Sequence, residues 1–234
     1  MRVVVGASIL VVVFTLCIGL GLWQLDRADE KRTLFQLFAL GETKELLTEL
    51  ELDEGPDGDR YRRVELRGSF SSSQQFLLDA MTHAGRAGYE VLTPFKLADT
   101  KGWVIVNRGW VAALADRAGI PDVAVRENPR TIRGRIDSLP RPGLRLAAGT
   151  TPALDAWPRV LLFPRMSELE AALKVPLFEY QLLLDPSEPD GFVREWQPRA
   201  MPPERHVAYA VQWFALAATV LCIGVILGVR RSKS

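Results

Sequence analysis

Two uncharged runs near the ends of the chain limit its fold more than any other feature. No charged residue occurs between Val3 and Leu25, and none occurs between Val207 and Val229. A run of 23 residues rises about 34 Å as an α-helix, enough to cross a hydrocarbon core of about 30 Å. The 234-residue chain is therefore predicted to place two transmembrane helices on either side of one middle domain.

The short charged flanks of these runs predict their orientation. Arg2 precedes the first run, and Arg230, Arg231 and Lys233 follow the second. Basic residues in short flanks favour the cytoplasmic side, so we expect both termini inside and a periplasmic middle domain. The first run is too long for a signal-peptide core and lacks a small-x-small cleavage site, so we expect a retained span. The expected parts are a first transmembrane helix (1–25), a β-rich domain (26–206), a second transmembrane helix (207–229) and a tail (230–234).

The composition of the middle segment argues against several classes of protein. Apart from the four flanking basic residues, the chain has 25 basic and 28 acidic residues, a net charge of −3. Nucleic-acid-binding proteins present a basic face, so we expect no nucleic acid partner. Cys17 and Cys222 both fall in the apolar runs, which leaves the middle without a disulfide or a thiolate metal site. We interpret both cysteines as small buried residues, at depths too different for a shared disulfide.

Alternating apolar and polar residues predict strands in the middle domain. Residues 63–68 alternate strictly, as in a half-buried strand. Pro94 argues for an edge position or a bulge in its strand, and the polar turn at 99–102 predicts a hairpin. Gly109 is expected to end a strand with a positive φ. Further strands are expected at 75–79, 88–97, 103–106, 131–136 and 177–185. The predicted fold class is a membrane protein with two transmembrane α-helices flanking a β-rich (α+β) extracytoplasmic domain.

Helical and loop signals complete this prediction. The first span is expected to continue as a helix to Gly41, and residues 45–50 form a second amphipathic stretch. Ser167-x-x-Glu170 has the capping-box pattern and predicts a short helix to about residue 174. Residues 139–158 are rich in Pro, Gly and Ala and predict a mobile loop. The acidic turn at 53–59 does not continue as a calcium loop, because the twelfth position is not Glu.

The chain lacks the familiar catalytic motifs, so we do not expect an enzyme. It has no phosphate-binding glycine loop, no Gly-x-Ser-x-Gly, no His-Glu-x-x-His and no Cys-x-x-Cys. A membrane-anchored hydrolase would need clustered polar residues in a cleft of the middle domain. Only two histidines are present, and His83 is interpreted as a solvated residue of a loop at 81–85.

His206 is unusual because it lies at the expected membrane boundary, and two interpretations stay open. It could be an interfacial residue beside the anchoring side chains of Tyr209 and Trp213. Alternatively, a neutral imidazole beside apolar surface could ligate a haem iron. Small residues below it permit close contact with a flat ligand, or with Gly19 and Gly21 of the first span. They are Ala210, Ala217, Gly224 and Gly228.

Four groups of residues, in this order, resemble the Surfeit locus protein 1 family. This family often has asparagine shortly before the second-helix histidine, where this chain has Pro203-Glu204-Arg205. The matching groups are Gly21-x-Trp23-Gln24-x-x-Arg27-x-x-x-Lys31, Tyr61-Arg62-Arg63-Val64 with Gly68, Val106-Asn107-Arg108-Gly109-Trp110-Val111, and His206-x-x-Tyr209-Ala210-x-Gln212-Trp213-Phe214.

The resemblance implies an assembly factor for haem-copper cytochrome c oxidase, a chaperone of respiratory chain biogenesis. Such a protein would hold or deliver haem a for insertion into subunit I, with His206 as the implied iron ligand. Haem a would be a transient cofactor, and the expected partners are subunit I, haem a synthase and membrane lipid. No Arg-rich, Ser-rich leader is present, so we expect a bacterial cytoplasmic (inner) membrane. The expected cofactor-binding residues are His206, Trp23, Gln24, Arg27, Tyr209 and Trp213.

Within that set, Gln24 and Arg27, with Lys31 on the same helix face, are expected to meet haem propionates, because Arg suits carboxylates. The aromatic residues would line the macrocycle or anchor the bilayer surface. An alternative function is a protein-only membrane scaffold that stabilises nascent subunit I without binding haem. In that case residues 107–110 would form a docking surface, although a structural turn is the other interpretation of this motif.

Overall fold

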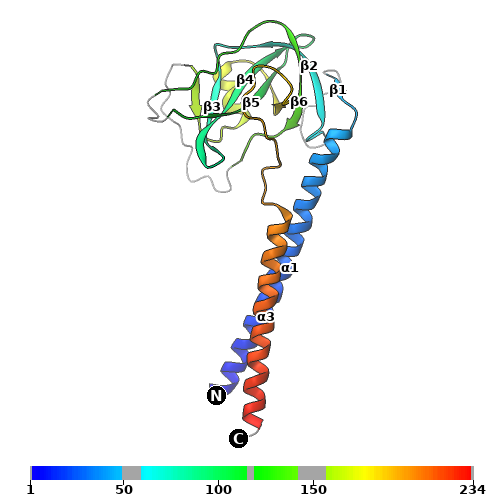
Figure 1. The fold of residues 1–234 in the computed structure, drawn as a ribbon, viewed down its shortest axis with the longest axis vertical. Helices are drawn as coiled ribbons and strands as arrows, with labels where there is room; N and C mark the ends of the chain where they lie inside the picture. Colours follow the sequence, from blue (N-terminus) through cyan, green and yellow to red (C-terminus); the bar gives the residue numbers. More distant parts are fainter. Residues whose placement is uncertain (1, 49–58, 115–118, 142–156, 233–234) are drawn as a thin grey trace. The chain divides into compact units, whose positions relative to one another are not determined.

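The computed structural model describes residues 2–48, 59–114, 119–141 and 157–232 of the chain (Figure 1). The chain divides into two compact units, one made of Met1–Gln36 with Pro198–Ser234 and the other of Leu37–Gln197. The elements are α1 (Arg2–Thr43), β1 (Leu47–Thr48), β2 (Arg63–Phe70), β3 (Phe76–His83), β4 (Arg86–Leu97), β5 (Trp103–Ala112), β6 (Arg130–Asp137), β7 (Arg159–Leu161), α2 (Met166–Leu173), β8 (Leu177–Leu184) and α3 (Pro203–Ser232).

The first unit contains two long apolar helices. Segments Val5–Thr43 of α1 and Pro203–Arg230 of α3 are long and apolar enough to cross a membrane. The expectation of two apolar helices flanking a β-rich domain is confirmed. As expected, α1 continues beyond the first uncharged run, and it ends at Thr43, two residues after Gly41. The membrane boundaries at 25/26 and 206/207 stay predictions.

The two helices run antiparallel and pack along one seam, with the N- and C-termini at the same end of the pair (Figure 1). A Cβ atom added to Gly21 would overlap the ring of Phe214, whereas Gly19 faces away from every neighbour. Cys222 is exposed on the helix surface, so the expectation that both cysteines are buried is wrong for this one. Buried small residues recur at the spacing of a helix–helix interface: Cys17, Gly21 and Ala28 on α1, and Ala210 and Ala217 on α3.

The second unit is built on a sheet that closes into a barrel. Strands β2, β6, β8, β5 and β4 pair in that order, and β4 pairs back with β2. β1 joins β2, while β3 and β7 extend the sheet from β4. Alternate residues such as Val104 and Val106 of β5 and Leu182 and Leu184 of β8 fill the barrel core. On the outer face, α2 packs Leu169 into a second cluster against β3, β4 and β5.

Strands β4 and β5 differ in detail from the predictions made from Pro94 and Gly109. β5 continues to Ala112 instead of ending at Gly109, which adopts the expected positive φ of 105° inside a bulge. Pro94 does not lie on an edge strand, because β4 is paired along both sides. It falls between the last pairing with β3, at Leu92, and the first with β2, at Phe95. Its missing N–H therefore removes no bond from either ladder.

Three further predicted segments differ from the structure or are defined by it. The amphipathic stretch at 45–50 contributes the short strand β1 within its described residues. α2 begins at Met166, where the Arg165 N–H donates to Glu168 at 3.0 Å, so Ser167 is not the cap. β3 includes His83, which pairs with Arg86 across a two-residue turn, so the expected loop at 81–85 is a hairpin. Most of the expected loop at 139–158 and of the acidic turn at 53–59 lies outside the described residues.

Candidate functional site

His206 lies in the first turn of α3 and contacts α1 directly. Pro203 begins this helix, a position where its missing N–H costs nothing. The Nδ1 atom of His206 is 2.7 Å from Oε1 of Gln24. The other ring nitrogen, Nε2, is buried and has no hydrogen-bond partner among the described residues. The structure therefore gives the two ring nitrogens different environments.

Small residues on both helices create the space for this contact. Gly21 and Ala28, one turn before and one turn after Gln24, are buried in the seam. Ala210 is buried one turn beyond His206 on α3. Because none of the three has a long side chain, the helix backbones approach closely and the amide of Gln24 reaches the imidazole.

The other expected site residues do not converge on His206. Trp23 and Tyr209 keep 48% and 42% of their surface exposed, as suits residues at a membrane interface. The Arg27 guanidinium lies 5.7 Å from the centre of the Trp23 ring and forms a 2.5 Å ion pair with Glu30. Among the six expected cofactor-binding residues, Gln24 and His206 are the only two that the described structure joins by a hydrogen bond. Trp213 is partly buried, and Lys31 also pairs with Glu30.

The environment of His206 fits a metal ligand. A buried polar atom without a hydrogen-bond partner costs about 1–3 kcal/mol, which a bound ligand can offset. Imidazole nitrogen is a common axial ligand of haem iron, and ligation would satisfy Nε2. Since this atom is enclosed by protein, the seam must open or the ring must turn before an iron can reach it.

The motif at 107–110 lies inside the barrel domain. Arg108 is only 1% exposed and donates to five neutral oxygens, three of which belong to two loops that are thereby held against the sheet. Burial lowers the pKa of Arg108 to about 10. The proposed docking surface is therefore wrong for Asn107 and Arg108, because both side chains are buried. The acceptors are Gln75 Oε1 (3.0 Å), Thr93 Oγ1 (3.5 Å) and the carbonyls of Val123 (2.7 Å), Ala124 (3.1 Å) and Asp190 (2.7 Å).

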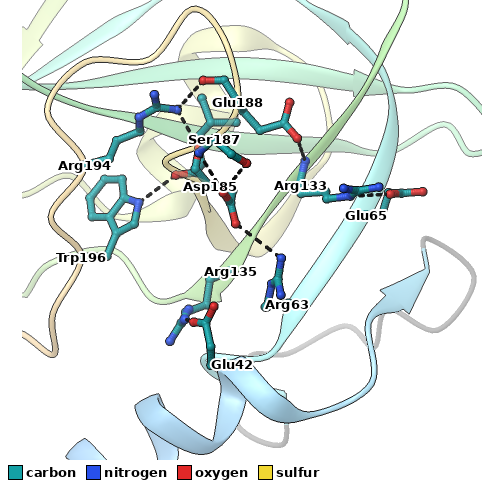
Figure 2. A network of polar contacts seen from close by, with 11 residues as sticks. Glu42, Arg63, Glu65, Arg133, Arg135, Asp185, Ser187, Glu188, Arg194 and Trp196 are labelled. Atoms are coloured by element: carbon teal, nitrogen blue, oxygen red, sulfur yellow. Dashed lines mark hydrogen bonds and ion pairs between the residues drawn. The ribbon is translucent and has the colours of Figure 1, made fainter.

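A second polar network ties the segment after β8 to the barrel (Figure 2). Arg194 donates to the carbonyls of Asp185 and Glu188, and the Trp196 indole donates to that of Leu184. Arg135 of β6 pairs with Glu42 at the end of α1. A cavity of about 470 Å³ lies here, and the arginines on its wall are matched by acidic side chains. Sequence reasoning missed this network, because its members come from distant parts of the chain.

Comparison with known proteins places the chain in a family. A profile of the SURF1 family matches residues 11–218, most of the chain. The chain belongs to the SURF1 family. It is 27% identical to a SURF1-like protein of Monosiga brevicollis, over 89% of this chain and 82% of that protein. A SURF1-like protein of Rickettsia felis is 23% identical over 93% of this chain and 94% of its own length. The cytochrome oxidase assembly protein SHY1 of Saccharomyces cerevisiae is 32% identical, over 40% of this chain and 24% of its own.

The residue groups that carried the resemblance to the SURF1 family lie in two places. The groups at 21–31 and 206–214 border the seam between α1 and α3. The group at 61–68 leads into β2, and the group at 106–111 lies in β5 and supplies the buried Arg108. The seam carries the candidate ligand, while the barrel groups have structural roles in packing and hydrogen bonding.

Proposed function

We propose that this SURF1-family protein is an assembly factor for cytochrome c oxidase that holds haem a before its insertion into subunit I. The observation that carries the proposal is the buried Nε2 of His206, which has no hydrogen-bond partner in the described part of the chain and lies in a pair of membrane-length helices. The name of the yeast relative, a cytochrome oxidase assembly protein, supports the process. In this proposal haem a is a cargo that the protein must both bind and release.

The enclosure of His206 suits temporary binding. If the seam has to open before iron reaches Nε2, the apparent affinity is reduced by the fraction of molecules that are open. A protein whose haem site must first open binds haem more weakly than one whose site is always formed, and so releases it more easily. Arg27 is exposed and pairs with Glu30 on the surface of α1, so it can exchange this partner for a haem propionate.

The proposed location is a bacterial inner membrane with both termini in the cytoplasm. The antiparallel helix pair brings the termini to one end, where Arg2, Arg230 and Arg231 provide the basic flanks of a cytoplasmic side. The barrel domain would then lie in the periplasm. Subunit I and haem a synthase are the proposed partners, and lipid would surround the exposed apolar faces of α1 and α3.

The test is haem loading of His206→Ala in cells that make haem a. The purified variant is expected to lose the haem absorption of the wild type, because its proposed iron ligand is missing. His83→Ala is the matched control, since His83 is the other histidine of the chain and lies in β3, within the barrel unit. The control should carry as much haem as the wild type.

Unchanged haem content and an unchanged Soret band in His206→Ala would refute the ligand role. Wild-type protein that copurifies with subunit I but carries no haem would instead favour the protein-only scaffold. Helical content should be compared by circular dichroism, so that loss of haem is not mistaken for loss of the helix pair.

A further inference from the structure

The hydrogen bond between Gln24 and His206 determines which ring nitrogen carries the proton. Oε1 of Gln24 lies 2.7 Å from Nδ1 of His206. An amide oxygen only accepts hydrogen bonds, so Nδ1 has to be the donor. In a neutral imidazole the other nitrogen, Nε2, then holds an unshared electron pair in the plane of the ring. This is the form of histidine that binds a metal.

The surroundings of Nε2 keep that electron pair unused. The atom is buried, and the described residues offer it no hydrogen-bond donor. A donor at this position would compete with an iron for the same electron pair. The amide of Gln24 is held on the opposite nitrogen by the close packing of α1 and α3 around Gly21 and Ala28. One nitrogen is thus occupied by a fixed partner and the other is left for a ligand.

We infer that Gln24 is a positioning residue that holds His206 in the Nδ1-protonated tautomer and so directs Nε2 to the iron of haem. The inference rests on the proposed function, and it gives Gln24 a role different from the expected propionate contact. Partners that hydrogen-bond the second nitrogen of a metal-bound histidine fix its tautomer and orientation, and their loss lowers metal affinity about 10–100-fold.

The tautomer can be measured without haem. His83→Ala leaves His206 as the sole histidine, so ¹⁵N-histidine labelling of the full chain in lipid nanodiscs reports on this ring alone. In this background we expect one tautomer, with the proton on Nδ1. Gln24→Leu removes the acceptor and should give a mixture of tautomers. Gln24→Glu keeps an acceptor in the same position and should restore the single form.

Haem affinity provides the second measurement. Gln24→Leu should bind haem about 10–100-fold more weakly than the wild type, whereas Gln24→Glu should stay within a few-fold. Circular dichroism in nanodiscs checks that both variants keep their helices. The inference is overturned if Gln24→Leu leaves the tautomer of His206 unchanged. It is also overturned if Gln24→Leu keeps full affinity for haem while His206→Ala loses haem.

Failure of the proposed function gives a different pattern. In that case either His206→Ala keeps its haem or the wild type carries none, and the role of Gln24 in presenting a ligand falls with it. The ¹⁵N spectra still show by themselves whether Gln24 sets the protonation of His206. The two experiments together therefore separate an error about the cargo from an error about the positioning residue.

Discussion

Arg108 shows how much of the barrel domain depends on a single buried side chain. Its guanidinium bonds to Gln75 and to the carbonyls of Val123, Ala124 and Asp190, and its carbon sits 5.0 Å from the centre of the Phe192 ring. The planar fork of arginine can satisfy several acceptors at once, which the single ammonium of lysine cannot. The charge thereby fastens two loops to the sheet.

Replacing Arg108 by Ala should destabilise the barrel domain by about 2–5 kcal/mol, because the change leaves several buried acceptors without donors. Urea unfolding of the detergent-solubilised protein, followed by tryptophan fluorescence, measures the change. Arg86→Ala is the control, since Arg86 is exposed at the start of β4, and it should stay within about 0.5 kcal/mol of the wild type. Equal urea midpoints for the two variants would contradict the role of Arg108 in holding the loops to the sheet.

Predictions for single residues were right where the local sequence sets the backbone conformation, and wrong where a distant segment sets the side-chain environment. The positive φ of Gly109 follows from local backbone demands and was predictable. The burial of Arg108 was not, because its acceptors come from segments up to 82 residues away. At the seam, Gly21 and Ala28 flank Gln24 at helical spacing, and that signal could have separated Gln24 from Arg27. The prediction instead placed Gln24 with Arg27 and Lys31, which recur at helical spacing on one face.

At the scale of elements, the contact between α1 and α3 depends on a residue without a side chain. A Cβ at Gly21 would occupy the space of the Phe214 ring, whereas one at Gly19 would meet nothing within 4 Å. The two glycines are two residues apart on the same helix, yet only Gly21 lies in the seam. They form a natural pair for testing the packing of the unit.

Gly21→Val should loosen the helix pair, because overpacking costs about 1–3 kcal/mol and would raise the open population about 5–150-fold. In a Cys222→Ser background, maleimide labelling of the buried Cys17 in detergent measures this opening. Gly19→Val should label at the wild-type rate. The seam assignment is wrong if both valine variants label equally fast.

The segment after β8 is held to the barrel by charges that respond to acid. Burial tends to raise the pKa of Asp185, but hydrogen bonds from Ser187 and the charges of Arg63 and Arg194 outweigh it, so its pKa is lowered overall. A group with a lowered folded-state pKa stabilises the fold at pH values above its ordinary pKa of about 3.9. That stabilisation is lost as the pH falls through the folded-state value.

Asp185→Asn should therefore lower stability at neutral pH and flatten the loss of stability that occurs as the pH falls from about 5 through the lowered folded-state pKa. Urea midpoints of the full chain at a series of pH values measure this difference. Asp99→Asn, at an exposed turn between β4 and β5, should keep the wild-type dependence. If the urea midpoints of Asp185→Asn and the wild type fall in parallel as the pH is lowered, the Asp185 carboxylate does not cause the loss of stability in acid.

At the scale of the whole molecule, the fold class was predictable and the strand order was not. Two uncharged runs of membrane length and the period-two alternation of the middle are local signals, and both led to the observed elements. No local signal shows that β8 inserts between β5 and β6, because that pairing depends on contacts between distant segments. The unpartnered Nε2 of His206 likewise depends on how α1 and α3 rotate about their axes.

The position of β8 also sets an order of events during synthesis. β5 and β6 are made first, but each lacks its neighbour until Leu177–Leu184 emerges and fills the space between them. Until then the chain carries two open strand edges, which are prone to pair with other chains. Only 18 residues separate Leu184 from Pro203, where α3 begins. The barrel can therefore close only shortly before the second apolar helix is made, so an interrupted chain would be left unfolded and anchored by α1 alone.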